Sequence, residues 1–366
     1  MQIGIIGLPS SGKTTIFNAL TRGQIETAAF SSGKLEVHTA MVDVPDARVD
    51  ALSKMFKPKK TTHAKVQYND IAGLARGIGE KGGIDGTLLN QIVQNDALLH
   101  VVRAFDDPNV PHIEETIDPQ RDLDILDTEL ILSDLGLVEK RLGRIHAQLL
   151  KHVGTQIERD AMVKEQALLQ RFQPQLENGK PIRDLELSAD DLRIIKNLAL
   201  LTHKPQLVVL NIGDAERAAR DPATIVKYDH RHTVLVALQG KLEMELAQMS
   251  PEDAADFLKE YGIAEPGLSR MIRVSYKLLG LHSFLTAGED EVRAWTVPVG
   301  AVAVDAAGTI HTDLARGFIR AEVTAYDDLI KCGDFAEARK HGLLRLEGKE
   351  YVVKDGDILN IRFNVS

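Results

Sequence analysis

The sequence predicts an α/β protein in which a parallel sheet is covered by helices, interrupted by a helical insertion and followed by a small β-rich domain. Three observations lead to this prediction. Short apolar runs alternate with helical patterns along much of the chain, as in parallel sheets covered on both faces. A leucine-rich, charged and glycine-poor segment breaks this order between about 120 and 200. Alternating, β-branched runs follow from about 283.

The opening segment predicts the first strand and the first helix. Residues 2–7 form a short β-branched run that ends at a glycine, which is typical of a buried strand. After Lys13, apolar residues recur at helical spacing at Ile16, Phe17 and Leu20. We therefore expect a strand, a glycine-rich loop and a helix in succession. Further strands are expected at 40–44, 64–70, 97–105, 206–212 and 233–238.

A helical hairpin, in the form of a short antiparallel coiled coil, is expected where the strand order breaks. One apolar seam steps alternately by three and four residues, the spacing of a coiled coil, and a second helix is expected from about 158 to 173. NGKP at 178–181 ends the hairpin, and Ser188 is a suitable cap for another helix. The alternative is one more helical layer of the main core. The seam residues are Leu135, Val138, Leu142, Ile145 and Leu149.

The C-terminal segment predicts a small β-rich domain. The runs RAWTVPVG, AVAVDAAGTI and GFIRAEVTAY are alternating or β-branched and are separated by Gly and Asp. A tight turn is expected at KDGD (354–357), between strands at 350–353 and 358–364. Trp295 alternates with apolar Val297 and is expected in the core. The predicted domains are 1–121 with 201–282 for the sheet, 122–200 for the insertion and 283–366 for the β-rich part.

Composition excludes several classes of protein. Hydrophobic residues make up 44% of the chain, which is enough for a core and excludes a mostly disordered protein. The apolar runs are too short to span a membrane, and the N-terminal segment lacks the basic region of a signal peptide. The single cysteine, Cys332, excludes an intrachain disulfide and a CxxC metal site. We therefore expect a cytoplasmic protein without a membrane partner. The net charge of −9 argues against a globally basic nucleic-acid binder, so no DNA partner is expected.

The loop after the first strand matches the P-loop pattern G-x-x-x-x-G-K-[ST]. Its glycines let consecutive backbone N–H groups point at phosphate oxygens, and the following helix adds its positive end. Lys13 reaches the β- and γ-phosphates and is the first catalytic candidate, while the Thr14 hydroxyl ligates Mg²⁺. A glycine loop with a surface lysine is the alternative. The predicted phosphate-binding residues are Gly7, Leu8, Pro9, Ser10, Ser11, Gly12, Lys13, Thr14 and Thr15.

A second motif, Asp70-Ile-Ala-Gly73, ends the strand at 64–70. Asp70 is placed to support Mg²⁺, and the N–H of Gly73 is placed to contact a γ-phosphate, so that the glycine-rich segment up to Gly86 would respond to hydrolysis. A turn capped by Asp70 is the alternative. Leu74 follows, where many Ras-like GTPases have a water-orienting glutamine, so this protein needs another group or hydrolyses slowly.

A third motif, Asn211-Ile212-Gly213-Asp214, follows the strand at 206–212. It occupies the place of the guanine-reading pattern N-K-x-D, with Ile212 where a lysine stem would cover the base. The Asp214 carboxylate is suited to accept two hydrogen bonds from guanine, which adenine cannot donate. A turn at the end of a strand is the alternative. Gln239 and Gly240, after the strand at 233–238, are expected in the remaining loop that contacts the base.

In the order in which these motifs occur, the sequence resembles the YchF/Obg-like ATPase family of P-loop NTPases. Stretches that match the family include GLPSSGKTTIFNAL, DIAGLARG, VVRAFDDPN and EVRAWTVPVGA, and they cover nearly the whole chain. The resemblance implies a P-loop NTPase domain, a coiled-coil insertion and a C-terminal TGS-like domain of β-grasp fold. It also implies ATP as the preferred or an accepted substrate, Mg²⁺, slow hydrolysis and association with ribosomes or translation factors. Family members have Glu at the position of Asp214, so this chain departs from the family in the base motif.

Two loop residues and one basic helical face are further candidates for function. The resemblance places a histidine at His112, in the loop DDPNVPHIEETIDP, where it is a candidate to orient or deprotonate water; a solvent-exposed histidine is the alternative. Thr39 is the candidate ligand from the first switch segment, and His100 is expected in the core. The insertion has a basic face that could contact rRNA phosphates, or that is simply solvated. Its basic residues are Lys140, Arg141, Arg144, His146, Lys151 and His152.

These observations predict a Mg²⁺-dependent switch that binds and slowly hydrolyses a nucleoside triphosphate. Its output would be the binding or release of a partner such as a ribosome or a ribosome-associated protein. Two alternatives stay open. The first is a GTPase that reads guanine through Asp214, and the second is a nearly inactive scaffold that nucleotide only stabilises. A P-loop kinase of small molecules is a poorer fit, because it would not need the second and third motifs.

Overall fold

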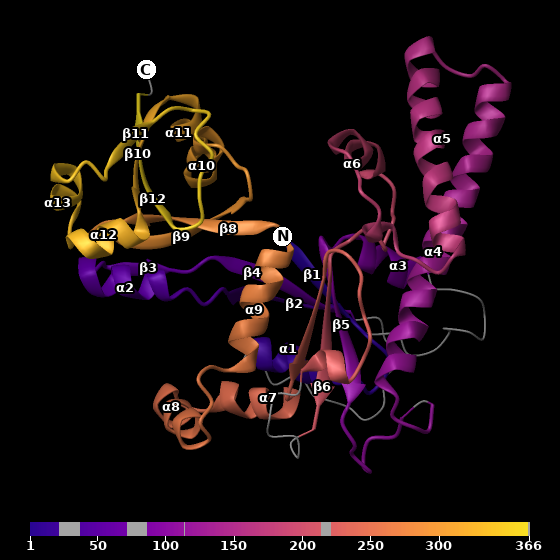
Figure 1. Cartoon of the computed structure of the whole chain (residues 1–366), viewed down its shortest axis with the longest axis horizontal. Helices are drawn as coiled ribbons and strands as arrows, with labels where there is room; N and C mark the ends of the chain where they lie inside the picture. Colours follow the sequence, from indigo (N-terminus) through magenta and orange to yellow (C-terminus); the bar gives the residue numbers. More distant parts are fainter. Residues whose placement is uncertain (22–36, 72–85, 113, 214–220, 365–366) are drawn as a thin grey trace. The chain divides into compact units, whose positions relative to one another are not determined.

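The computed structural model describes residues 1–21, 37–71, 86–112, 114–213 and 221–364 (Figure 1). The chain divides into two compact units, which are described separately below. The first consists of Met1–Ala40 and Gln67–Leu268, and the second of Met41–Val66 and Ser269–Ser366. Within the described residues, every helix is too short or too polar to cross a lipid bilayer.

The first unit is built on a six-stranded sheet. Neighbouring strands from β4 to β7 run parallel, and β6 is buried along its whole length. The apolar runs therefore predicted the strands and their parallel arrangement correctly, because a strand covered on both faces has little polar alternation. In spatial order the strands are β2 (Val37–Asp43), β4 (Lys65–Ile71), β1 (Gln2–Ile6), β5 (Ala97–Ala104), β6 (Gln206–Ile212) and β7 (Thr233–Leu238).

Helices surround this sheet and form two hydrophobic clusters with it. One cluster joins Leu126 and Leu130 to Ile6 and Leu98, and the other joins Leu123 to strand residues of β5 and β6. The helical elements are α1 (Lys13–Thr21), α3 (Gly86–Val93), α4 (Pro119–Leu150), α5 (Gln156–Glu177), η1 (Ile182–Asp184), α6 (Ala189–Ile195), η2 (Pro222–Thr224), α7 (Gly240–Gln248), α8 (Pro251–Glu260) and the start of α9 (Gly267–Leu278).

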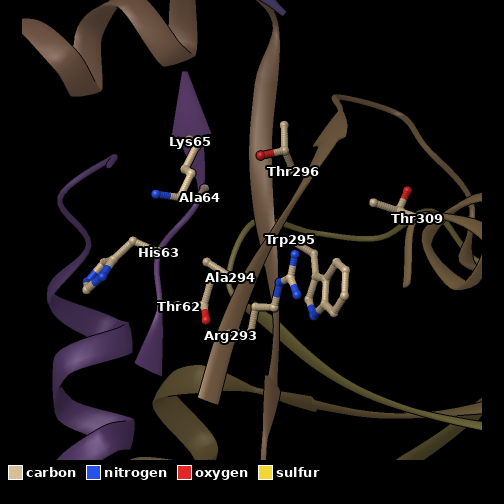
Figure 2. Close-up of a pocket in the computed structure, with 9 residues that line it drawn as sticks. All are labelled: Thr62, His63, Ala64, Lys65, Arg293, Ala294, Trp295, Thr296 and Thr309. Carbon is tan, nitrogen blue, oxygen red and sulfur yellow. The ribbon is translucent and has the colours of Figure 1, made fainter. Parts of the chain in front are cut away.

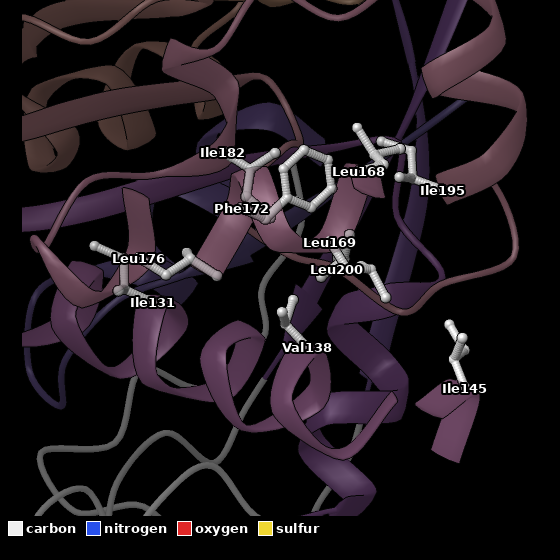
Figure 3. Packing of buried hydrophobic residues seen from close by; sticks show 10 residues of the cluster. All are labelled: Ile131, Val138, Ile145, Leu168, Leu169, Phe172, Leu176, Ile182, Ile195 and Leu200. Atoms are coloured by element: carbon white, nitrogen blue, oxygen red, sulfur yellow. The ribbon is translucent and has the colours of Figure 1, made fainter. Parts of the chain in front are cut away.

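The predicted helical hairpin is present as α4 and α5, which lie side by side (Figure 1). Val138 and Ile145 of the seam are in one hydrophobic cluster with Leu169, Phe172 and Leu176 of α5 (Figure 3). The other seam residues are partly buried and pack against this cluster. Thr155 begins α5 with a capping box, and Ser188 caps α6 as expected. The single helix α4 covers the sheet with its first turns and pairs with α5 further along. The proposed boundary at residue 122 therefore falls inside a continuous helix.

The second unit contains another six-stranded sheet, and helices pack against it. The short strand β3 pairs in parallel with β9, although more than two hundred residues separate them, and the Phe56 and Phe335 rings are 5.4 Å apart. The segment Met41–Val66 thus belongs with the C-terminal part, which the sequence did not indicate. In spatial order the strands are β11 (Arg345–Glu347), β10 (Phe318–Ala325), β12 (Asp357–Phe363), β8 (Leu281–Ala287), β9 (Glu291–Pro298) and β3 (Lys60–Thr62). The helices are α2 (Ala47–Phe56), α10 (Ala303–Ile310), α11 (Thr312–Arg316), α12 (Tyr326–Cys332) and α13 (Phe335–Lys340).

Two predictions for the C-terminal part were wrong in detail. The run AVAVDAAGTI forms helix α10, because its small residues Ala303, Ala306 and Ala307 make one buried helical face. Residues 350–353 form no strand, and Val352 makes only an isolated bridge with Val302. The turn itself was predicted correctly, since Asp357 accepts a hydrogen bond from the backbone of Lys354 at 2.9 Å. Strand β12 pairs instead with β10 and β8.

Candidate nucleotide-binding site

The loop between β1 and α1 has a backbone that requires glycine at two positions. Gly12 has φ +95°, and a Cβ atom there would lie 2.2 Å from Nδ2 of Asn211. A Cβ atom on Gly7 would lie 2.4 Å from the carbonyl oxygen of Val101. Both substitutions would push backbone or buried atoms aside. Leu8 and Ser11 are buried in the same loop, while Pro9, Ser10 and Thr15 are half-buried.

Lys13 lies across this loop. Its Nζ donates to the carbonyl oxygens of Gly7 at 2.9 Å and Leu8 at 2.8 Å. Burial lowers the pKa of Lys13 to about 8, and the neighbouring Asp70 carboxylate offsets part of that effect. The ammonium group thus spans the concave side of the loop, where phosphate oxygens could replace the two carbonyls.

Thr14 and Asp70 meet beside the loop, as the two motifs predicted. The Thr14 hydroxyl donates to Oδ2 of Asp70 at 3.1 Å, and the Asp70 residue is 2% exposed. Burial raises the pKa of Asp70, against the opposing effects of Lys13 and the Thr14 hydroxyl. Among the residues that the structure describes, Oδ1 of Asp70 and Oγ of Ser11 have no hydrogen-bond partner.

This arrangement fits a magnesium ion. A buried carboxylate oxygen without a partner, beside a hydroxyl group, offers the hard oxygen ligands that Mg²⁺ prefers. In the described ranges, no group of three or more His, Cys, Asp or Glu side chains is placed to hold a metal. A Mg²⁺ ion beside Thr14 and Asp70 would be held by one or two protein oxygens together with substrate phosphates and water.

Asn211 links the P-loop to the loop after β7. Its Nδ2 donates to the carbonyl oxygen of Ser11 at 3.0 Å, and its Oδ1 accepts from the backbone N–H of Gly240 at 3.0 Å. Gln239 donates to the carbonyl oxygen of Gly213 at 3.2 Å, which ties the β6 and β7 ends together. The side chain of Ile212 is buried in the core, so only its backbone is available to a base.

His112 is held by protein groups on both sides of its ring. Nε2 lies 2.7 Å from Oδ2 of Asp122, and Nδ1 accepts from the backbone N–H of Glu114 at 3.0 Å. The His112 side chain is 5% exposed, which differs from the solvent-exposed alternative. Through its contact with Asp122, His112 links its loop to the start of α4. The catalytic role of His112 stays a prediction.

Arg103 is a buried residue of this region that the sequence analysis missed. Its guanidinium donates to the carbonyl oxygens of Phe105, Val110 and Pro111 and stacks on the Phe105 ring at 4.5 Å. An arginine at the end of an otherwise apolar strand was the available signal. His100, in the same strand, is a core residue as expected, and burial lowers its pKa to about 4.

One predicted site residue, Thr39, does not contact the Thr14–Asp70 pair, and several others lie outside the described residues. The Thr39 hydroxyl donates to Asn69 at 2.9 Å. Because adjacent strand residues point to opposite faces, Asn69 and its partner lie on the other side of β4 from Asp70. Gly73, Leu74, Asp214 and the segment 72–85 lie outside the described residues.

Comparisons with known proteins agree with this geometry. A family model described as a 50S ribosome-binding GTPase matches residues 2–135, and the YchF-GTPase C-terminal model, described as a protein of unknown function, matches residues 281–364. The chain is 42% identical to the ribosome-binding ATPase YchF of Bacillus subtilis, with full coverage of both chains. It is 39% identical to the protein of the same name from Escherichia coli O157:H7, covering 100% of this chain and 99% of the relative.

Solved structures give the same result. The structure of the Schizosaccharomyces pombe YchF GTPase superposes with a TM-score of 0.83 at 32% identity, covering 99% of this chain and 97% of that one. A GTP-binding protein from Pyrococcus horikoshii shares the fold, with a TM-score of 0.57 at 18% identity and full coverage of both chains. Full-length identity, the paired family models and the P-loop geometry together show that the chain belongs to the YchF family of P-loop NTPases.

Proposed function

We propose that this protein is a Mg²⁺-dependent switch that binds a nucleoside triphosphate at the loop between β1 and α1 and hydrolyses it slowly. The observation that supports this most directly is the pairing of Thr14 with the buried Asp70, beside Lys13 and a loop that only glycine can form. A structural ion pair would satisfy both oxygens of Asp70. Here Oδ1 has no partner among the described residues.

Each of these residues has a distinct part in binding. Lys13 would exchange its contacts with the Gly7 and Leu8 carbonyls for contacts with the β- and γ-phosphates. The loop N–H groups and the start of α1 would hold the remaining phosphate oxygens. Thr14 and Asp70 would hold Mg²⁺, which neutralises phosphate charge when bound. Substituting Lys13→Ala should therefore abolish triphosphate binding, and unchanged affinity would contradict this assignment.

The names of the relatives and the residue at position 214 favour different nucleotides. The bacterial relatives are named ATPases, which favours ATP, whereas the S. pombe relative is named a GTPase. Asp214 is a carboxylate where guanine-reading proteins have one, which favours GTP. Paired titrations of ATP and GTP with Mg²⁺ would decide, with Asp214→Ala and Asp214→Glu variants alongside. Tighter ATP binding that does not depend on Asp214 supports ATP; tighter GTP binding that is lost in Asp214→Ala supports GTP.

His112 is the proposed replacement for the missing glutamine at Leu74. For this role the ring would have to release Asp122, because both of its nitrogens are engaged in the present conformation. The His112→Ala variant should then lower turnover at saturating nucleotide without changing nucleotide affinity. Asp122→Asn is the matched variant, since it weakens the clamp but keeps the imidazole. Unchanged turnover in His112→Ala would remove His112 from the mechanism.

A nearly inactive scaffold remains the second candidate function. Leu74 cannot orient water, and the contacts of His112 leave neither ring nitrogen free. Such a scaffold would gain stability from nucleotide without consuming it. Turnover at saturating ATP or GTP separates the two candidates. Hydrolysis that is abolished by Lys13→Ala identifies a switch, and thermal stabilisation without hydrolysis identifies a scaffold.

We infer that the partner is the ribosome, as the names of the bacterial relatives suggest, and that the protein acts in the cytoplasm. The insertion is the proposed point of contact with rRNA. Lys140, Arg144 and Lys151 are exposed there, whereas Arg141 is occupied by Glu165 at 2.6 and 2.9 Å. Neutralising the three exposed cations should weaken co-sedimentation with ribosomes, most strongly at low salt. The matched control neutralises three other exposed cations of the insertion, Lys180, Arg193 and Lys196.

A further inference from the structure

The second unit has a pocket of about 280 Å³ whose polar lining is largely engaged within the protein (Figure 2). Lys65 is paired with Asp43 at 2.8 Å, and the Thr296 hydroxyl accepts a hydrogen bond from Tyr276 at 2.9 Å. Trp295, which was expected in the core, is half-buried and forms part of the wall. The first unit contains a buried polar network of another kind, which surrounds helix α3.

Helix α3 begins directly after the segment 72–85, and its two ends are held differently. At the N-terminal end, Gly86 and Thr87 are exposed, and the first buried residue is Leu88. The C-terminal end is buried, because Asn95, which follows the helix, is 2% exposed. The end of α3 that is nearer in sequence to Asp70 is therefore the exposed one.

Two buried side chains fasten the C-terminal end of α3. The Lys204 ammonium donates to the carbonyl oxygen of Val93 at 3.1 Å and to that of Asn95, so its positive charge lies at the negative end of the helix dipole. The Asn95 side chain accepts from Asn69 of β4 at 2.7 Å and donates to the carbonyl oxygen of Gln91 at 2.8 Å. This end of α3 is therefore fixed both to the sheet and to the chain around Lys204.

The chain around Lys204 is in turn bound by the base of the helical hairpin. Asp134 of α4 accepts from the backbone N–H groups of Leu201 and Thr202 at 2.8 and 2.7 Å, and from the Thr202 hydroxyl at 2.6 Å. Arg183, in η1 after α5, donates to the carbonyl oxygens of Thr202 at 3.2 Å and Lys204 at 3.1 Å. All of these groups are buried, so water cannot readily replace the bonds.

Apolar packing gives α3 a second connection to α4. Leu88 and Ile92 belong to the same buried cluster as Leu126 and Leu130 of α4 and Leu201. A close-packed core transmits a displacement instead of absorbing it. A tilt of α3 about its fixed C-terminal end would therefore move Leu88, which lies near the other end, against α4.

We propose that α3 is a lever that passes the nucleotide state of the first site to the helical hairpin, with its C-terminal end, held by Lys204 and Asn95, as the pivot. This inference rests on the proposed function, since gain or loss of the γ-phosphate would act on the chain between Asp70 and Gly86. The output is the orientation of the hairpin, which is the proposed contact with the ribosome. Nucleotide and ribosome would then change each other's affinity by the same factor.

The experiment measures the distance between the hairpin and the sheet domain by pulsed electron paramagnetic resonance. Spin labels are attached through Lys164→Cys on α5 and Glu245→Cys on α7, which are exposed positions, in the full-length chain with Cys332→Ser. The probes are Mg²⁺ with the β,γ-imido analogues of ATP and GTP. We expect the distance distribution to shift when either analogue binds, and to stay unchanged in the Lys13→Ala variant, which should bind neither.

Two substitutions break the connection on opposite sides of the same segment. Lys204→Met removes the bonds to α3, and Asp134→Asn weakens the bonds to α4; each variant should still bind the analogue but lose most of the shift. The double variant should lose little more than either single one, because both act in one chain of contacts. Lys196→Met removes an exposed lysine of the same region and should behave like the parent. Circular dichroism confirms that each variant is folded.

The outcomes separate this inference from the proposed function. If neither analogue binds, the proposed function fails and the lever fails with it. If an analogue binds without a shift in the parent, the lever alone is overturned. A full shift in both Lys204→Met and Asp134→Asn also overturns it, since the hairpin would then respond by another route.

Discussion

Replacing Asn211 by alanine tests whether one side chain holds two loops of the nucleotide site together. The change removes the donor to the Ser11 carbonyl oxygen and the acceptor for the Gly240 N–H. Asn211 is 5% exposed, so water cannot easily take over either bond. The Gly240 N–H is one of the first amides of α7 and has no partner inside its own helix.

The size of the effect follows from leaving two buried backbone groups unpaired. Each such group costs about 1–3 kcal/mol, and local relaxation recovers part of it. We therefore expect the two loops to open more easily by about 2–3 kcal/mol, which corresponds to roughly 30- to 150-fold faster amide exchange. Hydrogen–deuterium exchange of peptides covering residues 7–14 and 239–248 measures this directly. Nucleotide affinity should fall in proportion to the fraction of molecules in which the loops are open, since only the closed form binds.

Two comparisons make this test decisive. Asn109→Ala removes an amide from an exposed loop residue, so exchange in both peptides should stay as in the parent protein. Asn211→Asp keeps the shape but faces the Ser11 carbonyl oxygen with a carboxylate oxygen, so it should be at least as disruptive as alanine. If Asn211→Ala exchanged like the Asn109→Ala control and bound nucleotide normally, the linking role derived from the two hydrogen bonds would be refuted.

Three further outcomes follow from the buried charges. Burial lowers the pKa of Lys13 to about 8, so triphosphate binding above that pH requires the uptake of a proton. The affinity measured by titration should therefore fall by up to about tenfold per pH unit above pH 8. An affinity that does not change with pH would contradict this. In Asp70→Asn, the affinity for ATP measured with Mg²⁺ should fall at least about tenfold, while the affinity measured without Mg²⁺ should stay nearly unchanged. An equal loss of affinity under both conditions would argue against a metal role for Asp70. His100 has its pKa lowered by burial to about 4, so its contribution to stability is complete above about pH 6.5 and is lost as the pH falls towards 4, by roughly 3 kcal/mol. Urea unfolding of His100→Gln should show a weaker acid dependence than the parent, and identical slopes would contradict the assignment.

The sheet and the phosphate loop were predictable because their signals are local. A fully buried parallel strand reads as a continuous apolar run, and residues 206–212 are buried throughout, as their composition suggested. The P-loop glycines, Lys13 and Thr14 form one contiguous motif. The meeting of Thr14 with Asp70 was also predictable, because a residue at the end of a neighbouring parallel strand lies at the same edge of the sheet.

The features that were missed depend on contacts between distant parts of the chain. Strand β3 is three polar residues long, and only its pairing with β9 makes it a strand. The run at 303–310 contains both β-branched residues and alanines. It forms a helix because this places its alanines on one buried face.

The order of strands β4, β1, β5, β6 and β7 separates two tasks along one edge of the sheet. Asp70 lies near the end of β4, next to the P-loop that follows β1, which is where we propose the metal and the terminal phosphates. Gly213 and Gln239 follow β6 and β7, and we propose the base at that other end. Asn211 is the direct link between the two, through Ser11 and Gly240. In the proposed site, a change at the base-contacting position Asp214 leaves the Thr14–Asp70 pair as it is, so relatives named for ATP and for GTP can share this layout.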